Sequence, residues 1–356
     1  METINSTLEY LDDYLDYYYN NSNVVSVQEE PSHGGKDISR ILSVVIYSLT
    51  CLLGILGNGL VIVIITFKMK RSINALWFLN LAAADFLFNI FLPLNIAYTA
   101  MNYDWVFGEA LCKLNSFLLN LNLCCSVLLL TTISIDRCVS VVFPVWAQNH
   151  RTIKLACLIC IVVWSAGFLM SCPSLIFRQT VSHQGKMVCF NNYSLSKKDH
   201  DLGVKRHTAV NVIKFLTGFA IPVIIIMVCY TIIVFKLKRN RLAKTKKPFK
   251  IIIAIIVTFF LCWTPFHILN LLEVQYAHFS HVLFEIGIPI VTALAAANSC
   301  MNPILYVFMG QEFKKFKVGI LSRLVNALSE DTTYSSLAHR SFSKMSSMTE
   351  KETVFL

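Results

Sequence analysis

Charged residues are scarce in this chain of 356 residues. Lysine, arginine, aspartate and glutamate together make up 15% of it, whereas hydrophobic residues make up 55%. A soluble domain normally carries about 25% charged residues. The apolar residues also gather in runs of about 20 or more, which is long enough to cross a bilayer. A soluble enzyme with such runs would aggregate, so the composition excludes that class and indicates an integral membrane protein.

Three further absences argue against other functions. No C-x-x-C pair is flanked by additional metal ligands, which argues against a zinc site. Residues 286–309, in the last apolar run, contain no lysine, and a retinal-binding pump or photoreceptor needs one there. The chain shows no internal repeat, which argues against transporters built from inverted repeats.

The most prominent feature of the sequence is one long apolar run, from Cys112 to Pro144. It carries no charge between Leu114 and Ile135, and near its end stands Asp136-Arg137-Cys138. As a helix rising about 1.5 Å per residue, the run would be about 45 Å long, more than the roughly 30 Å of bilayer hydrocarbon. We therefore expect this helix to tilt or to protrude from the membrane.

The sequence predicts an all-α membrane protein whose residues 40–308 form a seven-transmembrane helix bundle. We expect the spans at about residues 40–67, 75–100, 110–142, 153–176, 207–236, 249–273 and 282–308. Lysine and arginine cluster after the first, third, fifth and seventh spans, which places those loops in the cytoplasm. The N-terminus is then extracellular and the C-terminus cytoplasmic, in the plasma membrane. The net charge of +10 is largely this inner collar facing anionic membrane lipids, so it does not imply nucleic acid.

The segments outside the bundle carry candidate modification sites. Residues 1–39 are an acidic, tyrosine-rich extracellular tail, which suits either a solvating segment or a docking arm for a basic ligand. Residues 309–323 are basic and amphipathic, which predicts a short helix on the inner leaflet. Glycosylation sequons begin at Asn5 and Asn20 in the tail and at Asn192 in an outer loop. Residues 324–356 predict a disordered cytoplasmic tail with these candidate phosphorylation sites: Ser329, Thr332, Thr333, Ser335, Ser336, Ser341, Ser343, Ser346, Ser347 and Thr349.

Two cysteines differ from the rest in their surroundings. Most of the 12 cysteines lie inside apolar runs, where Cys behaves as a small buried residue. Only Cys112 and Cys189 are predicted to lie in outer, polar surroundings. Because an extracellular face is oxidising, we expect these two to form a disulfide.

Charged residues also approach the outer mouth of the predicted bundle. Arg178, Lys214 and Glu273 lie near the outer ends of their spans, and His267 is one to two turns below Glu273. A basic pair at a pocket rim suits the capture of a carboxylate, such as a peptide C-terminus. The alternative for Arg178 is that it snorkels to the lipid headgroups.

Polar groups inside the apolar runs are costly, so each marks a candidate site. Asp85 is the most isolated of them. A carboxylate with neutral oxygens near it suits a small hard cation such as sodium, or a water cluster. Interhelical hydrogen bonds that serve packing explain the same residues equally well. The other polar residues at mid-span are Asn58, Asn122, Ser126, Asn298, Ser299 and Asn302.

Several short motifs follow one another along the predicted spans: Gly57-Asn58, Leu81 to Asp85, Cys112, Asp136-Arg137-Cys138, Trp164, Pro222 with Tyr230, Cys262-Trp263-Thr264-Pro265 and Asn302-Pro303-Ile304-Leu305-Tyr306. Together they resemble those of the rhodopsin-like (class A) G-protein-coupled receptors over nearly the whole chain. Within that family, Pro144 to Arg151 resembles the chemoattractant receptors of the formyl-peptide and chemerin group. Arg239 to Lys250 and Ser322 to Asp331 look most similar to the chemerin receptors of that group.

The resemblance implies roles for individual residues. Arg137 is expected to be held by Asp136 at rest and to contact a G protein when it is freed. Tyr230 and Tyr306 are expected to move toward it on activation, and Trp263 to sense the ligand. Pro265 and Pro303 pair a helix kink with a bulky neighbour, which suits a bundle with two states. The resemblance also implies a sodium site at Asp85, Asn122, Ser126, Asn298 and Asn302, the disulfide Cys112–Cys189, and ligand contacts at Arg178, Lys214 and Glu273.

The chain departs from the family pattern at informative positions. Thr245 replaces the acid that locks Arg137 in some relatives, which leaves Asp136 as the expected main restraint. Asn120, a candidate ligand contact, stands where formyl-peptide receptors carry an aspartate. Leu119 stands where amine receptors need one. Recognition of formyl peptides and of small amines is therefore disfavoured.

Together these features predict a receptor rather than an enzyme, with no cofactor except an allosteric sodium ion. We expect an extracellular peptide or protein chemoattractant as its ligand, most similar to the C-terminal part of chemerin, in chemotaxis and inflammation. Inside the cell we expect an inhibitory-type heterotrimeric G protein, receptor kinases and arrestins as partners. The alternatives are a receptor for an acidic lipid mediator, a receptor for formyl or complement peptides, and a decoy that binds a chemoattractant without signalling.

Overall fold

The computed structural model describes residues 33–69, 71–183, 185–193, 200–239, 246–273, 279 and 281–309. It divides into two compact units, Met1–Ile304 and Leu305–Leu356, and everything below concerns the first unit unless stated. The described residues form 7 helices long and apolar enough to cross a membrane, so the predicted seven-helix fold is confirmed. Asn5, Asn20, the predicted helix at 309–323 and all the candidate phosphorylation sites lie outside the described residues.

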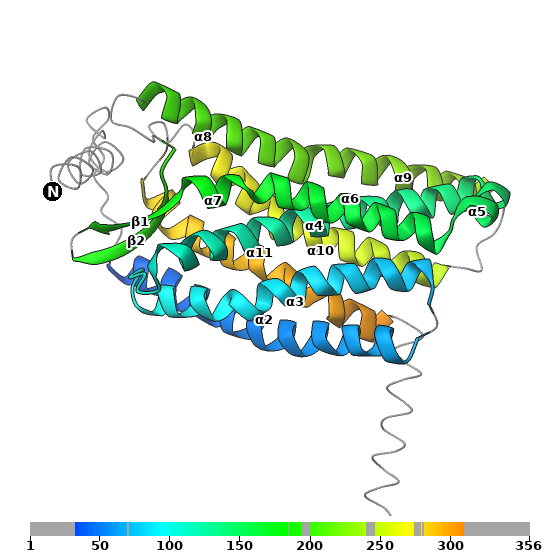
Figure 1. Ribbon diagram of the computed structural model, residues 1–356, viewed down its shortest axis with the longest axis horizontal. Coiled ribbons are helices and arrows are strands. Elements are labelled where there is room, and N and C mark those ends of the chain that lie inside the picture. Colours follow the sequence, from blue (N-terminus) through cyan, green and yellow to red (C-terminus); the bar gives the residue numbers. More distant parts are fainter. Residues whose placement is uncertain are drawn as a thin grey trace, which may run out of the picture. The chain divides into compact units, whose positions relative to one another are not determined.

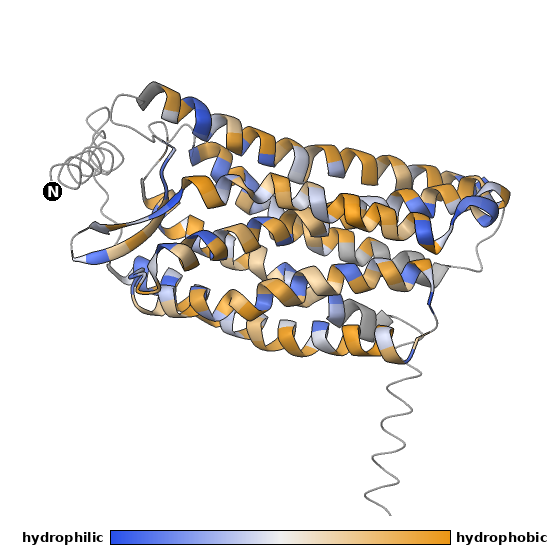
Figure 2. Cartoon of the chain, in the orientation of Figure 1, coloured by the Kyte–Doolittle hydropathy of each residue, from blue (hydrophilic) through white to orange (hydrophobic). Residues whose placement is uncertain are grey.

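The long helices lie alongside one another (Figure 1). Hydrophobic residues cover most of their lengths, while hydrophilic residues gather toward the two ends of the bundle (Figure 2). The long helices are α2 (His33–Phe67), α3 (Ile73–Ala100), α4 (Gly108–Val142), α6 (Ile153–Ser171), α8 (His200–Phe215) continued by η1 (Leu216–Ala220) and α9 (Ile221–Arg239), α10 (Lys246–Glu273) and α11 (His281–Met309).

Two helices begin well before their predicted spans. Helix α2 begins at His33, before the predicted span at 40–67. Its first turns are anchored to α11, because Lys36 pairs with Glu285 at 2.5 Å and the Ser39 hydroxyl donates to the Ile286 carbonyl at 2.9 Å. Helix α8 begins at His200 rather than at 207, because a polar helix can continue beyond the apolar run that hydropathy detects.

Two short helices and one two-stranded hairpin were not predicted. Helix α5 (Pro144–His150) follows α4, with proline at its first position, where a missing N–H costs nothing. Helix α7 (Pro173–Phe177) continues α6 after a break at Cys172. Strands β1 (Arg178–His183) and β2 (Lys186–Asn191) form an antiparallel hairpin, which we call the hairpin, and Gly185 supplies the positive φ of 77° that its turn requires.

The π-helical turn η1 lies just before Pro222. Proline has no backbone N–H to donate to the carbonyl four residues earlier, and its ring crowds that carbonyl. The wider π turn accommodates the ring without ending the helix. The prolines at 93, 265, 289 and 303 all lie inside helices.

Helix α4 is the centre of the bundle. It packs against α3, α6, α9, α5, α7 and β1. Close approach to α6 depends on Gly167, since a Cβ there would lie 2.6 Å from the Cys125 sulfur. The Trp164 indole, also on α6, donates to the Asn80 side chain of α3 at 3.0 Å. The run from Cys112 to Pro144 therefore becomes the element that the other helices share.

Candidate functional site

A cavity of about 350 Å³ lies at the end of the bundle that carries the hairpin. Its walls come from α4, α7, both strands, α8, α10 and α11. All five predicted ligand residues line it: Asn120, Arg178, Lys214, His267 and Glu273. The structure therefore brings these five residues to one cavity, and their role as ligand contacts stays a prediction.

Two cations and one carboxylate face this cavity. Arg178, the first residue of β1, donates from Nε to the Cys189 sulfur at 3.2 Å. Burial lowers the pKa of the Arg178 guanidinium, and neighbouring Tyr98, Tyr193 and Glu273 oppose that shift. An arginine remains charged in spite of this. Lys214, on α8, is half-buried and is the second cation in the lining. The lining therefore carries two basic side chains and one carboxylate, that of Glu273.

His267 lies deeper in the cavity wall and is 3% exposed. The rings of Phe215, Phe219, Trp263 and Phe266 surround it, with centroids 6.2, 5.2, 6.3 and 5.6 Å away. Within the described part of the chain, its Nε2 has no hydrogen-bond partner. A buried nitrogen without a partner is costly. The cavity therefore ends in a polar atom set among aromatic rings, which suits a ligand group that is apolar with one polar tip.

Other lining residues were not predicted. They include His207 and Asn211 on α8 and Asn270 on α10. His207, Asn211 and Lys214 follow i, i+4, i+7 spacing, which places them on one helix face. Asn270 stands between His267 and Glu273 at helical spacing in the same way. Searching for polar residues on the helix faces of Lys214 and His267 would have found them.

Asn120 offers a ligand fewer hydrogen-bonding atoms than a free asparagine side chain would. Its Nδ2 donates both to the Ser116 carbonyl and to the Ser174 hydroxyl, each at 2.8 Å. Both amide hydrogens are therefore engaged, and the side-chain oxygen is the atom left for a ligand.

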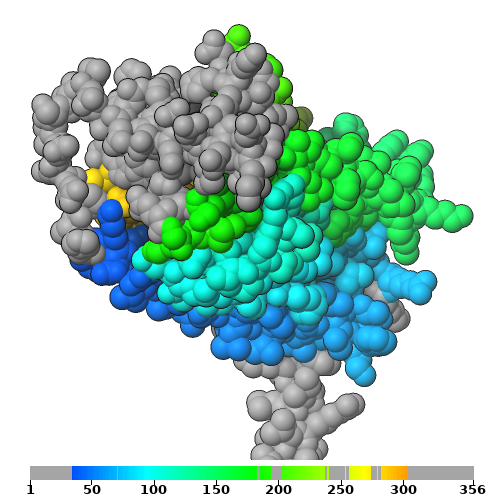
Figure 3. Space-filling model, turned by 60° about the vertical axis from the view of Figure 1, so that its left-hand side comes forward, coloured from blue at the N-terminus to red at the C-terminus, as the bar shows by residue number. Residues whose placement is uncertain are grey.

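The disulfide between Cys112 and Cys189 is present, with Cα atoms 5.9 Å apart, so the predicted pairing is confirmed. It ties β2 to the first turns of α4. The hairpin is further held by the Trp105 N–H, which donates to the Met187 carbonyl at 2.7 Å, and by the Met187 N–H, which donates to Asp104 at 2.9 Å. In Figure 3 the hairpin, in green, lies beside the cyan segment that contains these partners. The cavity wall on this side is therefore fixed.

The candidate glycosylation residue Asn192 lies just after β2. Its backbone N–H donates to the Phe177 carbonyl at 2.7 Å, and its Nδ2 donates to the Gln179 side chain at 3.1 Å. A glycan on Nδ2 would replace one hydrogen of that amide. Glycosylation of Asn192 stays a prediction.

Asp85 is fully buried at mid-bundle and accepts three side-chain hydrogen bonds. Asn122 donates to Oδ1 at 2.8 Å, Ser126 to Oδ1 at 3.4 Å, and Asn302 to Oδ2 at 2.7 Å. Asn298 is 1% exposed, and neither of its side-chain polar atoms has a partner among the described residues. The polar cluster that the sequence predicted therefore comes together from α3, α4 and α11.

This cluster fits a sodium ion. Sodium prefers oxygen ligands, and Asp85, Ser126 and Asn298 all offer one. The unpartnered Asn298 amide is the observation that points to a missing ligand or water, since buried polar groups normally have partners. Among the described residues no group of three or more histidine, cysteine, aspartate or glutamate side chains gathers as for a transition metal.

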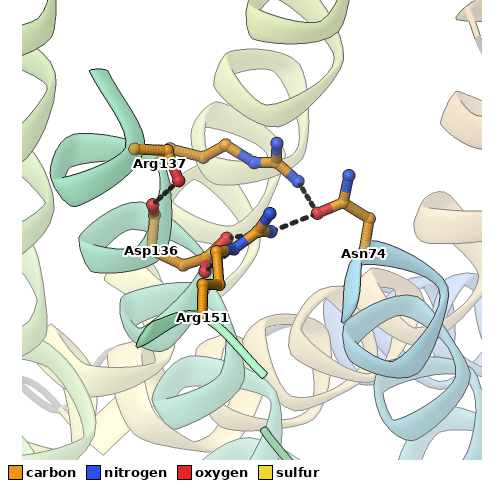
Figure 4. A network of polar contacts seen from close by, with 5 residues as sticks. Asn74, Asp136, Arg137 and Arg151 are labelled. Atoms are coloured by element: carbon orange, nitrogen blue, oxygen red, sulfur yellow. Dashed lines mark hydrogen bonds and ion pairs between the residues drawn. The ribbon is translucent and has the colours of Figure 1, made fainter. Parts of the chain in front are cut away.

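The opposite end of the bundle holds Arg137, and its contacts here differ from those that the family resemblance implies for the resting receptor. Asp136 does not hold Arg137. Its carboxylate is paired with Arg151, at 2.6 Å from Nε and 2.7 Å from Nη2 (Figure 4). Arg137 instead donates to the side-chain oxygen of Asn74 at 2.5 Å, and Arg151 donates to the same oxygen at 2.6 Å.

The other predicted activation residues occupy the bundle core. Trp263 is fully buried, with Phe259, Phe266 and His267 around it. Tyr230 on α9 is close enough to Arg137 to interact electrostatically. The side chain of Tyr306 lies outside what the structure describes. Trp263 thus touches the cavity residue His267 on one side and the core on the other, which is the position expected for a ligand sensor.

Comparison with known proteins agrees with this architecture. The family model described as 7 transmembrane receptor (rhodopsin family) matches residues 57–306. Chemerin-like receptor 1 of Sus scrofa is 57% identical over 366 residues, which cover 100% of this chain and 99% of that protein. Chemerin-like receptor 1 of Homo sapiens is 56% identical over 345 residues, 94% of this chain and 91% of that protein. Chemerin-like receptor 2 of Homo sapiens is 40% identical over 320 residues, 88% of each chain.

Proposed function

Because the chain belongs to the rhodopsin family of seven-transmembrane receptors, we propose that it is a plasma-membrane receptor for a peptide chemoattractant, and that the ligand is chemerin or a peptide similar to its C-terminal part. The relatives named chemerin-like receptor support this ligand, and their identity extends over nearly the whole chain. The observation that carries the proposal is the cavity with two cations at its wall, Arg178 and Lys214. A receptor of this family is not an enzyme.

Arg178 and Lys214 are the proposed carboxylate-binding pair. A guanidinium forms charge-assisted hydrogen bonds with a carboxylate, and these are about twice as strong as neutral ones. The disulfide-bound hairpin holds Arg178 in place, which reduces the entropy lost on binding. A terminal carboxylate between the two cations, with the preceding side chain near His267, fits this lining.

The rest of the lining favours a peptide over an acidic lipid. Asn120, Asn211 and Asn270 contribute side-chain amides, and His207 adds a polar ring. Each of these amide nitrogens already has a hydrogen bond within the protein, so the side-chain oxygens are the atoms left for a ligand. A peptide N–H can donate to such an oxygen, whereas an acyl chain cannot. The lipid-mediator alternative is therefore the weaker one.

We place the hairpin end outside the cell and the Arg137 end in the cytoplasm. The lysine and arginine residues that follow α2, α4 and α9 support this orientation. Arg137 is then the proposed contact for an inhibitory-type G protein, and the serine- and threonine-rich tail the substrate of receptor kinases before arrestin binding. Retention of Asp136-Arg137 and of Asn302 to Tyr306 argues against a decoy, which has no use for them.

The deciding experiment compares a chemerin C-terminal peptide with the same peptide carrying a C-terminal amide. The readout is G-protein activation in cells that express the receptor. We expect amidation to lower potency about tenfold or more, because a charge-assisted pair is lost. The double variant R178Q/K214Q should lose potency for the acid and respond equally to both peptides. The matched control is Lys205→Ala, an exposed cation on the same helix as Lys214, which should respond as wild type.

Each alternative has its own outcome in this assay. Equal potency of acid and amide on the wild-type receptor would exclude carboxylate capture. A response to formyl or complement peptides, or to an acidic lipid, with none to the chemerin peptide would reassign the ligand. Peptide binding without G-protein activation would support the decoy.

A further inference from the structure

Both carboxylate oxygens of Asp136 accept hydrogen bonds from Arg151. Arg151 uses Nε and Nη2 on separate oxygens, at 2.6 and 2.7 Å, which is the two-point geometry that guanidinium and carboxylate groups favour. The Asp136 side chain is 11% exposed and that of Arg151 28%. A pair this sheltered from water is screened far less than a surface pair. Both oxygens of Asp136 therefore already accept from Arg151, and Arg137 would have to share them with a second positive charge while Arg151 stays in place.

Arg137 rests on a neutral partner instead. Its Nη2 donates to the Asn74 side-chain oxygen, and its Nε has no hydrogen-bond partner in the part of the chain that the structure describes. Asp136 is nonetheless close enough to interact with it electrostatically. The guanidinium is thus held by one amide oxygen, within reach of a carboxylate that another arginine occupies.

The backbone places Arg151 for this contact. It directly follows α5, and its N–H donates to the Ala147 carbonyl at 3.0 Å. The next residue, Thr152, caps α6 by accepting from the Leu155 N–H at 3.2 Å. Asn74 is placed likewise, within the first turn of α3, which Ser72 caps. Arg151 and Asn74 therefore come from fixed helix ends rather than from free loops.

We propose that Arg151 is a positioning residue for Arg137: by occupying Asp136, it keeps Arg137 on Asn74 and available to a G protein. Without Arg151, a sheltered carboxylate would lose its cation, and such a charge takes the next available partner. That partner is Arg137. The exchange of partners follows from this geometry alone, and only its effect on signalling rests on the proposed function.

The signalling test uses purified receptor in lipid nanodiscs and an inhibitory-type G protein, with nucleotide exchange as the readout. Arg151→Ala should lower exchange about fivefold or more, the size of a typical coupling between two states. R151A/D136N should recover at least half of the wild-type rate, because the carboxylate that captures Arg137 is gone. Arg151→Lys, which keeps a cation, should fall between. Lys154→Ala, an exposed cation three residues further on, is the matched control and should equal wild type.

A structural readout decides the inference independently of signalling. A structure of the R151A receptor, or of Arg151→Gln should the alanine variant not fold, should show the Arg137 guanidinium within hydrogen-bond distance of Asp136. Arg137 remaining on Asn74 overturns the inference, as does an R151A exchange rate equal to that of K154A. A wild-type receptor that activates no G protein contradicts the proposed function instead, and the structural readout then decides the inference.

Discussion

At the scale of single residues, many buried polar side chains have hydrogen-bond partners, and a few among the described residues have none. Asp85 accepts from Asn122, Ser126 and Asn302, whereas the buried amide of Asn298, one helical turn before Asn302 on α11, has no partner among the described residues. Each unmatched buried group costs about 1–3 kcal/mol unless a ligand or water satisfies it. A bound ion or water that contacts the Asn298 amide would therefore remove this free-energy cost.

The sodium proposal is tested by replacing Asp85 with asparagine. In the wild-type receptor, sodium chloride should lower agonist affinity about fivefold relative to potassium chloride at equal ionic strength, within the usual range of coupling between sites. D85N should lose this difference, because the neutral amide no longer attracts a cation. Agonist binding to membranes in the two salts measures it. If sodium still lowered agonist affinity in D85N, Asp85 would not be part of the sodium site.

At the scale of elements, the π turn η1 determines which residues of α8 face the cavity. A π turn contains one residue more than the α-helix would use over the same length, and each residue turns the helix by about 100°. Lys214 lies just before this turn and His207 and Asn211 lie on the same face of α8. The insertion therefore aims all three side chains into the cavity.

Deleting Thr217 should convert η1 into regular helix and rotate α8 by about 100° relative to α9. Lys214 would then leave the cavity, and peptide potency should fall about tenfold or more, as expected for a lost charge-assisted contact. Antibody binding to an N-terminal epitope on intact cells would show that the variant reaches the surface. Unchanged potency of a surface-expressed deletion variant would show that the π turn does not orient the site.

At the scale of the whole molecule, the hairpin is joined to α4 firmly enough that we expect the two to move together. The disulfide closes a sequence separation of 77 residues, and Trp105, Cys112 and Cys189 form one buried cluster. The backbone hydrogen bond from Trp105 to Met187 crosses the same junction. The wall that carries Arg178 is thereby joined to the central helix of the bundle.

Replacing both cysteines, in C112S/C189S, should lower the free energy of unfolding by about 2–5 kcal/mol and weaken peptide binding, because the hairpin is released from α4. Thermal unfolding in detergent and peptide binding measure the two effects. Cys157→Ser, at an exposed free cysteine, is the control and should change neither. A double variant as stable as this control would show that the remaining hairpin contacts suffice.

The sequence predicted the bundle and five of the residues that line the cavity, because both depend on local signals. Apolar runs of membrane-spanning length predict helices, and the oxidising compartment predicts the pairing of Cys112 with Cys189. The partner of Asp136 could not be predicted in this way. Arg151 reaches it only because α5 turns the chain back, and α5 was not predicted. The early starts of α2 and α8 were missed for a related reason, since polar helical turns beyond the bilayer leave no hydropathy signal.

The central position of α4 also determines where motion can be measured. Its sequence contains no proline, whereas α3, α10 and α11 each contain at least one. We expect α4, which packs against many elements and has no proline, to move least on activation, and the proline-containing helices α10 and α11 to move more. A spectroscopic label on α4 therefore supplies a stationary reference. Distances from it to α10 and α11 would report ligand-driven displacement directly.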